Sequence, residues 1–114
     1  MSPENTTRLF DDFPALFRGR FRPITENLMG FGFECGDGWF SLIHSLCAQI
    51  AAHAKSNKLH PLAVQVKEKY GSLRFYIHGA DARINDRVEA ADRASESICE
   101  VCGAPGRVLQ RADG

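Results

Sequence analysis

This chain of 114 residues has no excess of charge of either sign, because 14 Lys and Arg balance 14 Asp and Glu. Balanced charge removes the strongest electrostatic argument for broad nucleic-acid binding and argues against an acidic mimic of DNA. The sequence also has no apolar run near the roughly 20 residues that a membrane span needs. Its N-terminus lacks the basic and apolar regions of a secretory signal. We therefore expect a cytoplasmic protein with reduced thiols and no membrane partner.

Cysteine is scarce, with four in the chain, and two of these stand close together at Cys99 and Cys102. The spacing C-x-x-C followed by Gly103 is typical of a tight turn that points both thiols at one tetrahedral metal ion. A closed zinc site needs four ligands, and the 12 residues after Cys102 contain neither Cys nor His. The sequence thus predicts a zinc half-site at Cys99 and Cys102.

The missing ligands would come from upstream residues or from another chain. The upstream candidates are Cys35, Cys47, His44, His60 and His78. Cys47 lies on the apolar side of a predicted helix, which favours a place in the core. Two chains pooling their pairs would make one four-cysteine site. The alternatives are two thiols without metal and, least favoured, a disulfide oxidoreductase, whose pair would open a helix after a strand.

The order of patterns predicts the fold class. Ordinary hydrophobic (44%) and charged (25%) contents favour one folded domain over residues 1–114, with 99–114 as a knuckle-like tail. Two or three helices are expected to pack on a β-hairpin or small antiparallel sheet, which makes the domain α+β. The expected elements are a helix within 6–18, a short strand at 31–35, a helix over 38–55 capped by Asp37, strands over 63–69 and 72–78, and a helix capped by Asp81.

Alternation along the two hairpin strands separates two faces. Val64, Val66, Leu73, Phe75 and Ile77 are expected to point to the core, and Gln65, Lys67, Lys69, Arg74, Tyr76 and His78 to the other face. Lys67, Lys69, Arg74 and Tyr76 form a basic and aromatic patch suited to phosphate, RNA or an acidic protein surface. The alternative is a solvated sheet face whose charges prevent aggregation. Glu68 shares the register of the apolar face, so we expect it at the edge or buried beside an Arg.

A third motif runs from Glu34 to Trp39. Two acids, Glu34 and Asp37, flank Cys35 in a glycine-rich loop before a helix, as a metal-assisted or nucleophilic site would require. Asp37, however, is interpreted as a helix cap and Trp39 as a core residue. No His or Asn lies near Cys35 in sequence to activate the thiol. We therefore expect no catalytic residues.

Three blocks together resemble a family of small uncharacterised proteins from bacteria and their phages: FECGDGW (33–39), VQVKEKYGSLRFYI (64–77) and CEVCGAPG (99–106). The resemblance spans roughly residues 30–106. It implies that relatives carry a later C-x-x-H pair, which would complete a zinc site with Cys99 and Cys102. The present sequence reaches Gly114 before such a pair. The resemblance brings no activity with it, but its phage setting suggests an accessory role towards the host.

These observations favour a non-catalytic protein-interaction module, a phage accessory protein or inhibitor of a host defence system, acting as a monomer or homodimer on a protein partner. The alternative is a nucleic-acid-binding protein with the knuckle as scaffold, which predicts binding with steep salt dependence. A third hypothesis is a small enzyme that uses Glu34, Cys35 or Asp37.

Overall fold

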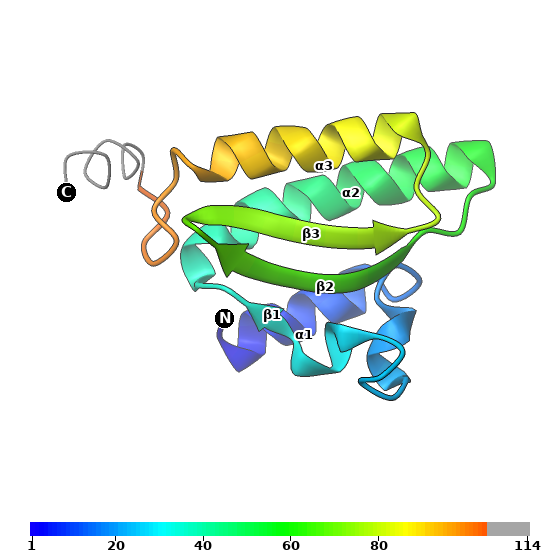
Figure 1. Cartoon of the computed structure of the whole chain (residues 1–114), viewed down its shortest axis with the longest axis horizontal. Helices are drawn as coiled ribbons and strands as arrows, with labels where there is room; N and C mark the ends of the chain where they lie inside the picture. The colour runs from blue at the N-terminus through cyan, green and yellow to red at the C-terminus, as the bar shows by residue number, and fades with distance from the viewer. Residues whose placement is uncertain (105–114) are drawn as a thin grey trace.

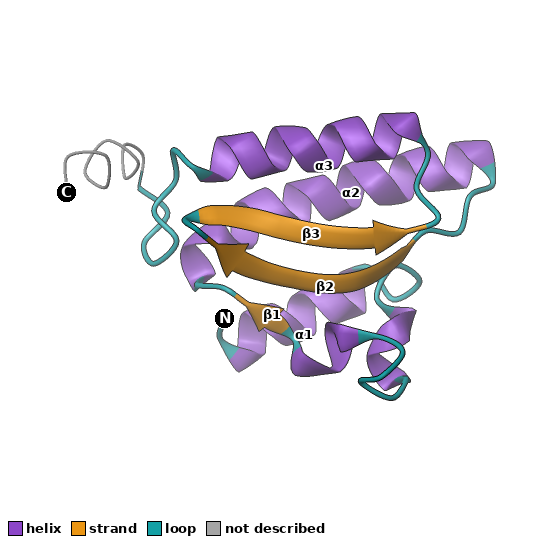
Figure 2. Ribbon diagram, viewed as in Figure 1, coloured by secondary structure: helices purple, strands orange, loops and turns teal. Residues whose placement is uncertain are grey.

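The computed structural model describes residues 1–104, which form one α+β domain. In chain order the elements are α1 (Pro3–Asp12), β1 (Phe33–Glu34), α2 (Phe40–Asn57), β2 (Leu62–Lys69), β3 (Ser72–His78) and α3 (Ala82–Ser95), with short 3-10 turns at Arg18–Phe21, Leu28–Phe31 and Asp37–Trp39. Figures 1 and 2 show α2 behind the sheet and α3 running alongside β3. The predicted α+β class with a β2–β3 hairpin is confirmed.

The sheet has the strand order β1–β2–β3. β2 and β3 form the antiparallel hairpin, and β1 runs parallel to β2 with Phe33 opposite Val66. The sheet is therefore mixed, where the sequence predicted antiparallel pairing alone. The reason is the connection: β1 reaches β2 through the crossover helix α2, and such a connection makes neighbouring strands parallel.

An irregularity in β2 changes which side chains face the core. Ala63 and Gln65 pair with consecutive residues of β3, which leaves Val64 as an extra residue between them. A bulge of this kind shifts the alternation by one residue. Ala63 and Val66 are fully buried while Val64 is half-buried, so the predicted inward position of Val64 is wrong. Of the other predicted core positions of the hairpin, Val66, Leu73 and Phe75 are buried and Ile77 is partly buried.

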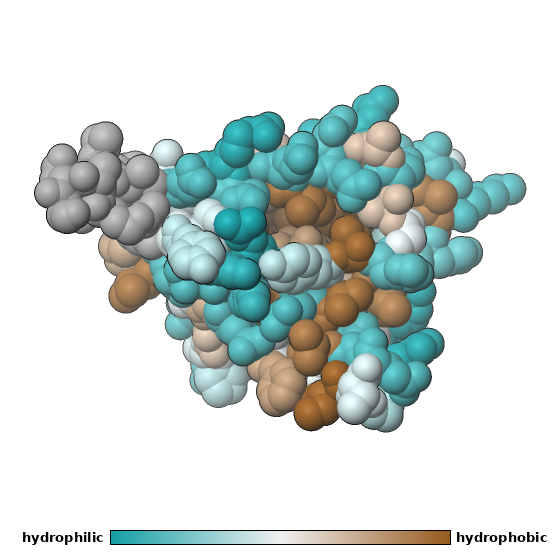
Figure 3. Space-filling view, viewed as in Figure 1, coloured by the Kyte–Doolittle hydropathy of each residue, from teal (hydrophilic) through white to brown (hydrophobic). Residues whose placement is uncertain are grey.

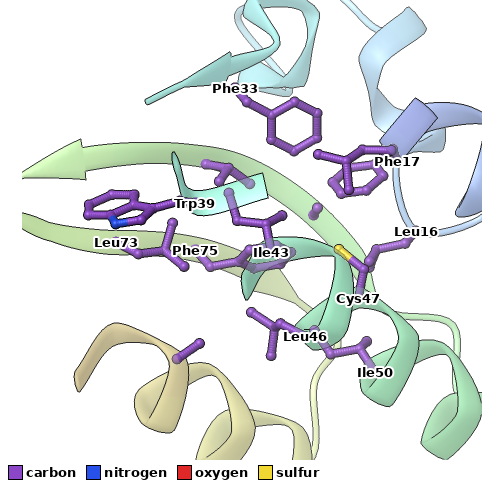
Figure 4. Close-up of a cluster of buried hydrophobic side chains, with 14 of the residues drawn as sticks. Leu16, Phe17, Phe33, Trp39, Ile43, Leu46, Cys47, Ile50, Leu73 and Phe75 are labelled. Atoms are coloured by element: carbon purple, nitrogen blue, oxygen red, sulfur yellow. The ribbon is translucent and has the colours of Figure 1, made fainter. Parts of the chain in front are cut away.

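α2 carries the central stripe of the core (Figure 4). Its buried side chains follow helical spacing at Ile43, Leu46, Cys47, Ile50 and Ala54, and Trp39 stands just before them. The apolar face predicted for 38–55 is confirmed, including Cys47 as a core residue. Burial also raises the pKa of the Cys47 thiol, which disfavours the thiolate that a metal would need. None of the helices in residues 1–104 is long and apolar enough to cross a membrane.

The start of α2 differs from the prediction. α2 begins at Phe40, after the turn Asp37–Trp39, and no side-chain hydrogen bond caps it. The Oδ1 atom of Asp37 instead accepts hydrogen bonds from the Ser2 backbone N–H (2.8 Å) and from Asn5 Nδ2 (3.0 Å). These bonds lower the pKa of the Asp37 carboxyl. The predicted capping role is wrong because the carboxylate has a better pair of donors at the start of α1.

The first helix is also displaced from its expected place within 6–18. α1 covers Pro3–Asp12, with Ser2 as its N-cap and Pro3 in its first turn, and the chain leaves the helix before Pro14. Its apolar residues still reach the core, where Leu9 is fully buried and Phe10 packs edge-on against Phe17 of the following segment.

α3 begins as predicted. The Oδ1 atom of Asp81 accepts a hydrogen bond from the Ile84 backbone N–H (2.9 Å), which is the geometry of an N-cap. Its Oδ2 atom lies 2.7 Å from His53 Nε2 on α2, and the His53 hydrogen bond is the larger cause of the lowered Asp81 pKa. At the other end of α3, Ser95 Oγ accepts a hydrogen bond from the Leu73 backbone N–H (2.8 Å), which satisfies one donor on the free edge of β3.

Candidate functional site

The hairpin brings together the residues predicted to bind. Gln65 pairs with Tyr76 and Lys67 pairs with Arg74 across the two strands, and Lys69 stands at the turn. We call Gln65, Lys67, Lys69, Arg74 and Tyr76 the hairpin face. It is the side of the sheet turned to the viewer in Figure 1, opposite the side against which α2 packs.

Two acidic side chains that sequence reasoning missed border the hairpin face. Glu34 on β1 is in register with Lys67, and its Oε1 atom accepts a hydrogen bond from Gln65 Nε2 (3.2 Å). On the other side, Asp92 Oδ2 of α3 lies 4.0 Å from Arg74 Nη1. The order across the sheet is therefore acid, base, base, acid, and this row is charge-balanced, while Lys69 at the turn leaves one positive charge over. Only the strand order and the position of α3 reveal these neighbours.

The turn of the hairpin presents an aromatic residue in a strained conformation. Tyr70 has φ 54° and Gly71 has φ 82°, so both central residues of this two-residue turn are left-handed, a conformation in which Asn-Gly is favoured. A tyrosine there costs about 1 kcal/mol. Its side chain is 84% exposed, with Lys69 Nζ 5.6 Å from the ring centroid. Tyr-Gly between two strand patterns was the available signal, although the tyrosine was not predicted as a binding residue.

Glu68 has its partner in the same turn. Its Oε2 atom accepts a hydrogen bond from the Gly71 backbone N–H (2.7 Å). The carboxylate thus closes the turn beneath Tyr70, and the expected Arg partner is not the group that binds it. Glu68 is half-buried, and it lies on the central strand β2 and not on an edge strand.

Exposed apolar side chains continue the hairpin face towards the segment before β1. Figure 3 shows hydrophobic residues gathered over one half of β2 and β3 and extending towards the 3-10 turns, with hydrophilic residues over the half near the β2–β3 turn. The large exposed hydrophobic residues in those turns and their connection are Phe21, Ile24 and Phe31. Apolar surface beside charged residues is common where proteins bind one another.

The C-x-x-C turn packs on the glycine-rich loop before α2, at the same end of the domain as the β2–β3 turn (Figure 1). The Gly38 N–H donates to the Glu100 carbonyl (2.7 Å) and the Gly36 N–H donates to Glu100 Oε2 (2.8 Å). Trp39 Nε1 donates to the Ile98 carbonyl (2.9 Å). These bonds explain the glycines at 36 and 38, since a Cβ atom at either would overlap the backbone of the turn.

The metal-binding prediction at Cys99 and Cys102 meets only part of its requirements. Within the turn, the Gly103 N–H donates to the Cys99 carbonyl (2.8 Å), and Gly103 has the left-handed φ of 79° that such a turn needs. No group of three or more His, Cys, Asp or Glu side chains that could hold a metal ion occurs among residues 1–104. The turn thus offers two sulfur donors, and a closed zinc site needs two more.

Zinc bound by the two thiols of this turn would need two further ligands, and a second copy of the turn is one source of them. Cys102 is exposed, so the turns of two copies can approach each other. We predict one zinc ion per two chains, measured by elemental analysis of purified protein together with native mass. Cys102→Ser should remove both the zinc and the dimer. One zinc per monomer would contradict this stoichiometry.

The catalytic hypothesis for Glu34, Cys35 and Asp37 gains no support from the geometry. Burial raises the pKa of the Cys35 thiol to about 12; the N-terminal ammonium group opposes the rise, and the negative charges of Glu100, Asp37 and Glu68 add to it. A thiol with this pKa is protonated at neutral pH and is a poor nucleophile. Glu34 and Asp37 accept hydrogen bonds from Gln65 and from α1, as described above.

Comparison of the chain with protein-family models, with curated proteins and with solved structures finds no match.

Proposed function

We propose that this protein is a non-catalytic interaction module that binds another protein through the hairpin face and the adjoining Tyr70. The observation that carries the proposal is the combination of an exposed, strained aromatic turn with a charge-balanced row across the sheet. Tyr and Arg are the residue types that dominate the binding energy of protein interfaces. Tyr70, Tyr76 and Arg74 supply three such side chains on one surface.

Charge balance favours a protein partner over nucleic acid. Glu34 and Asp92 border Lys67 and Arg74 on both sides, so a phosphate backbone laid across the sheet would meet two carboxylates. A nucleic-acid site is expected to carry uncompensated Lys and Arg. A protein surface can instead match alternating charges with its own.

Arg74 indicates what the partner offers. The ion pair of Arg74 with Asp92 is long, with 4.0 Å between Nη1 and Oδ2, and 37% of the Arg74 side chain stays exposed. A guanidinium group with unused donors binds a carboxylate in two parallel hydrogen bonds. We infer that the partner presents a carboxylate to Arg74 next to an apolar patch for Tyr70 and Tyr76. A host protein modulated by a phage accessory protein, as the resemblance implies, is the class of partner to test.

The experiment uses the wild-type chain and its variants as baits to capture a partner from host extract. The affinity of each variant for the isolated partner is then measured. Arg74→Glu and Tyr70→Asn should each lower the affinity for a specific partner by about 30-fold. This is the effect of losing a hot-spot side chain that contributes about 2 kcal/mol to the binding free energy. Tyr70→Asn should raise the free energy of unfolding by up to about 1 kcal/mol, because Asn favours the turn. Reduced binding by a stabilised variant cannot be attributed to misfolding.

A matched control is Arg83→Glu with Arg87→Glu on α3. Arg87 lies with Ser45 and Gln49 of α2, on the side of the sheet opposite the hairpin face, so this charge change should leave binding unchanged. Fluorescence anisotropy with single- and double-stranded oligonucleotides at two salt concentrations is the second arm. Tight oligonucleotide binding that weakens steeply with salt would contradict the protein partner and favour nucleic acid as the ligand.

A further inference from the structure

An apolar groove of about 600 Å³ lies where the chain passes from α1 towards the first 3-10 turn, against the second half of α2. Its apolar lining includes Phe13, Leu16, Ile50, Ala51, Ala54 and Leu59. α2 ends at the opposite end of the domain from the β2–β3 turn in Figure 1, so the groove is separate from the hairpin face. Its volume falls in the range of small-molecule sites, about 300–1,000 Å³.

Arg18 holds the two walls of the groove together. Its Nη1 atom donates to the Ala15 carbonyl (2.6 Å) and the Pro61 carbonyl (3.1 Å), and its Nη2 atom donates to the His60 carbonyl (3.1 Å). The Ala63 N–H adds a bond to the Leu16 carbonyl (2.9 Å). One side chain therefore joins the segment after α1 to the segment before β2, so the groove is formed before any ligand binds.

The charges around the groove are mainly positive. Lys55 and Lys58 line it together with Arg18, and no ion pair to either lysine occurs within the part of the chain that the structure describes. The carboxylate among the described lining residues is Asp12, which already lies 2.9 Å from His44 Nε2 and 3.7 Å from Arg8 Nε. The groove thus has an excess of positive charge available to a ligand.

The positive charges and the apolar surface of the groove occupy different stretches of α2. Ile50 and Ala51 lie in the middle of the helix, and Lys55 and Lys58 follow one and two turns later. Lys58 has φ 56°, a left-handed conformation for which glycine is the favoured residue. A positive side chain at a helix C-terminus also interacts favourably with the helix dipole and so stabilises the fold. The effects of Lys58 on binding and on stability therefore have to be measured separately.

We propose that the groove binds a single-chain anionic amphiphile, of the long-chain carboxylate class. Its alkyl chain would lie along Phe13, Ala51 and Leu59, which line the groove and are at least partly exposed, with its carboxylate at Lys55 and Lys58. The positive charges of Lys55 and Lys58 favour a ligand with an anionic head group. The apolar groove beside them favours a ligand with a single alkyl chain. This site is independent of the protein partner proposed above.

The test is calorimetric titration of the full chain with dodecanoate below its micelle concentration. We expect saturable binding with one ligand per chain, and no comparable binding of dodecyltrimethylammonium, which has the same tail and the opposite charge. Ala51→Trp fills the groove from an exposed helix position and should weaken binding at least tenfold. Lys55→Glu with Lys58→Glu should do the same, whereas Lys67→Glu with Lys69→Glu, the same charge change on the hairpin face, should not.

Lys58→Gly separates the head-group contact from stability. It relieves the left-handed strain, so the melting temperature should rise while dodecanoate binding weakens several-fold. On titration with dodecanoate, the backbone chemical shifts of residues 50–61 of the wild-type chain should change. This measurement tests the site even if a variant does not fold. Absence of saturable binding, equal binding of the cationic amphiphile, or unchanged binding by folded Ala51→Trp would overturn the proposal.

Discussion

Trp39→Ala is expected to lower the free energy of unfolding by about 3–5 kcal/mol, because it deletes a large, fully buried side chain from the core. Trp39 lies between the start of α2 and β3, close to Leu73 and Phe75 in Figure 4. It also donates its Nε1 hydrogen to the Ile98 carbonyl (2.9 Å). The substitution therefore opens a cavity and leaves a carbonyl group without its donor.

Chemical denaturation monitored by circular dichroism measures this change, with Trp39→Phe as the matched variant. Phenylalanine keeps most of the apolar contacts and loses the hydrogen bond, so its cost should be clearly smaller than that of alanine. A Trp39→Ala protein that unfolds at the wild-type denaturant concentration would show that the core is not built around this residue.

The elements that the sequence predicted well depend on local patterns. The stripe Ile43, Leu46, Ile50 and Ala54 repeats with the helical period, and any compact fold has to bury it. The capping of α3 by Asp81 is equally local, since the carboxylate reaches an N–H three residues ahead. The hairpin follows from two alternating strands around Tyr70-Gly71.

The errors arise where a distant part of the chain competes with a local interaction. Asp37 is a suitable helix cap by local rules, but Ser2 and Asn5 bring two donors to it from the N-terminus. The bulge at Val64 depends on the pairing of β2 with β3. β1 pairs with β2 although the whole of α2 separates the two strands in the sequence. None of these contacts leaves a periodic signal in the sequence.

The candidate site was predictable to the same degree. Lys67, Arg74 and Tyr76 share a face because of strand alternation, which is local. The acidic neighbours Glu34 and Asp92 come from β1 and α3, and they offset the charges of Lys67 and Arg74. The relation between the C-x-x-C turn and the glycine-rich loop likewise needed the fold, because Glu100 and Gly36 are 64 residues apart.

Gly38→Ala is expected to displace the C-x-x-C turn from the domain. A Cβ atom at this position would overlap the carbonyl oxygen of Cys99, and the neighbouring atoms of Glu100 are backbone and cannot rotate away. Overpacking against a fixed backbone costs about 1–3 kcal/mol, and here the turn can avoid the overlap by leaving the loop. The Gly38–Glu100 and Trp39–Ile98 hydrogen bonds would then be lost.

The chain's one tryptophan reports this displacement directly, since Trp39 touches the turn that would leave. We expect a red-shifted emission maximum and faster amide hydrogen exchange at 99–103, with α3 still protected. Gly30→Ala is the matched control, because its Cβ would lie 3.4 Å from the nearest atom, the Arg20 carbonyl oxygen, and its φ is not left-handed. Unchanged emission and exchange in Gly38→Ala would mean that the turn is not held by this loop. The two cysteines would then be positioned by α3 alone, and the shared zinc site would lose its structural support.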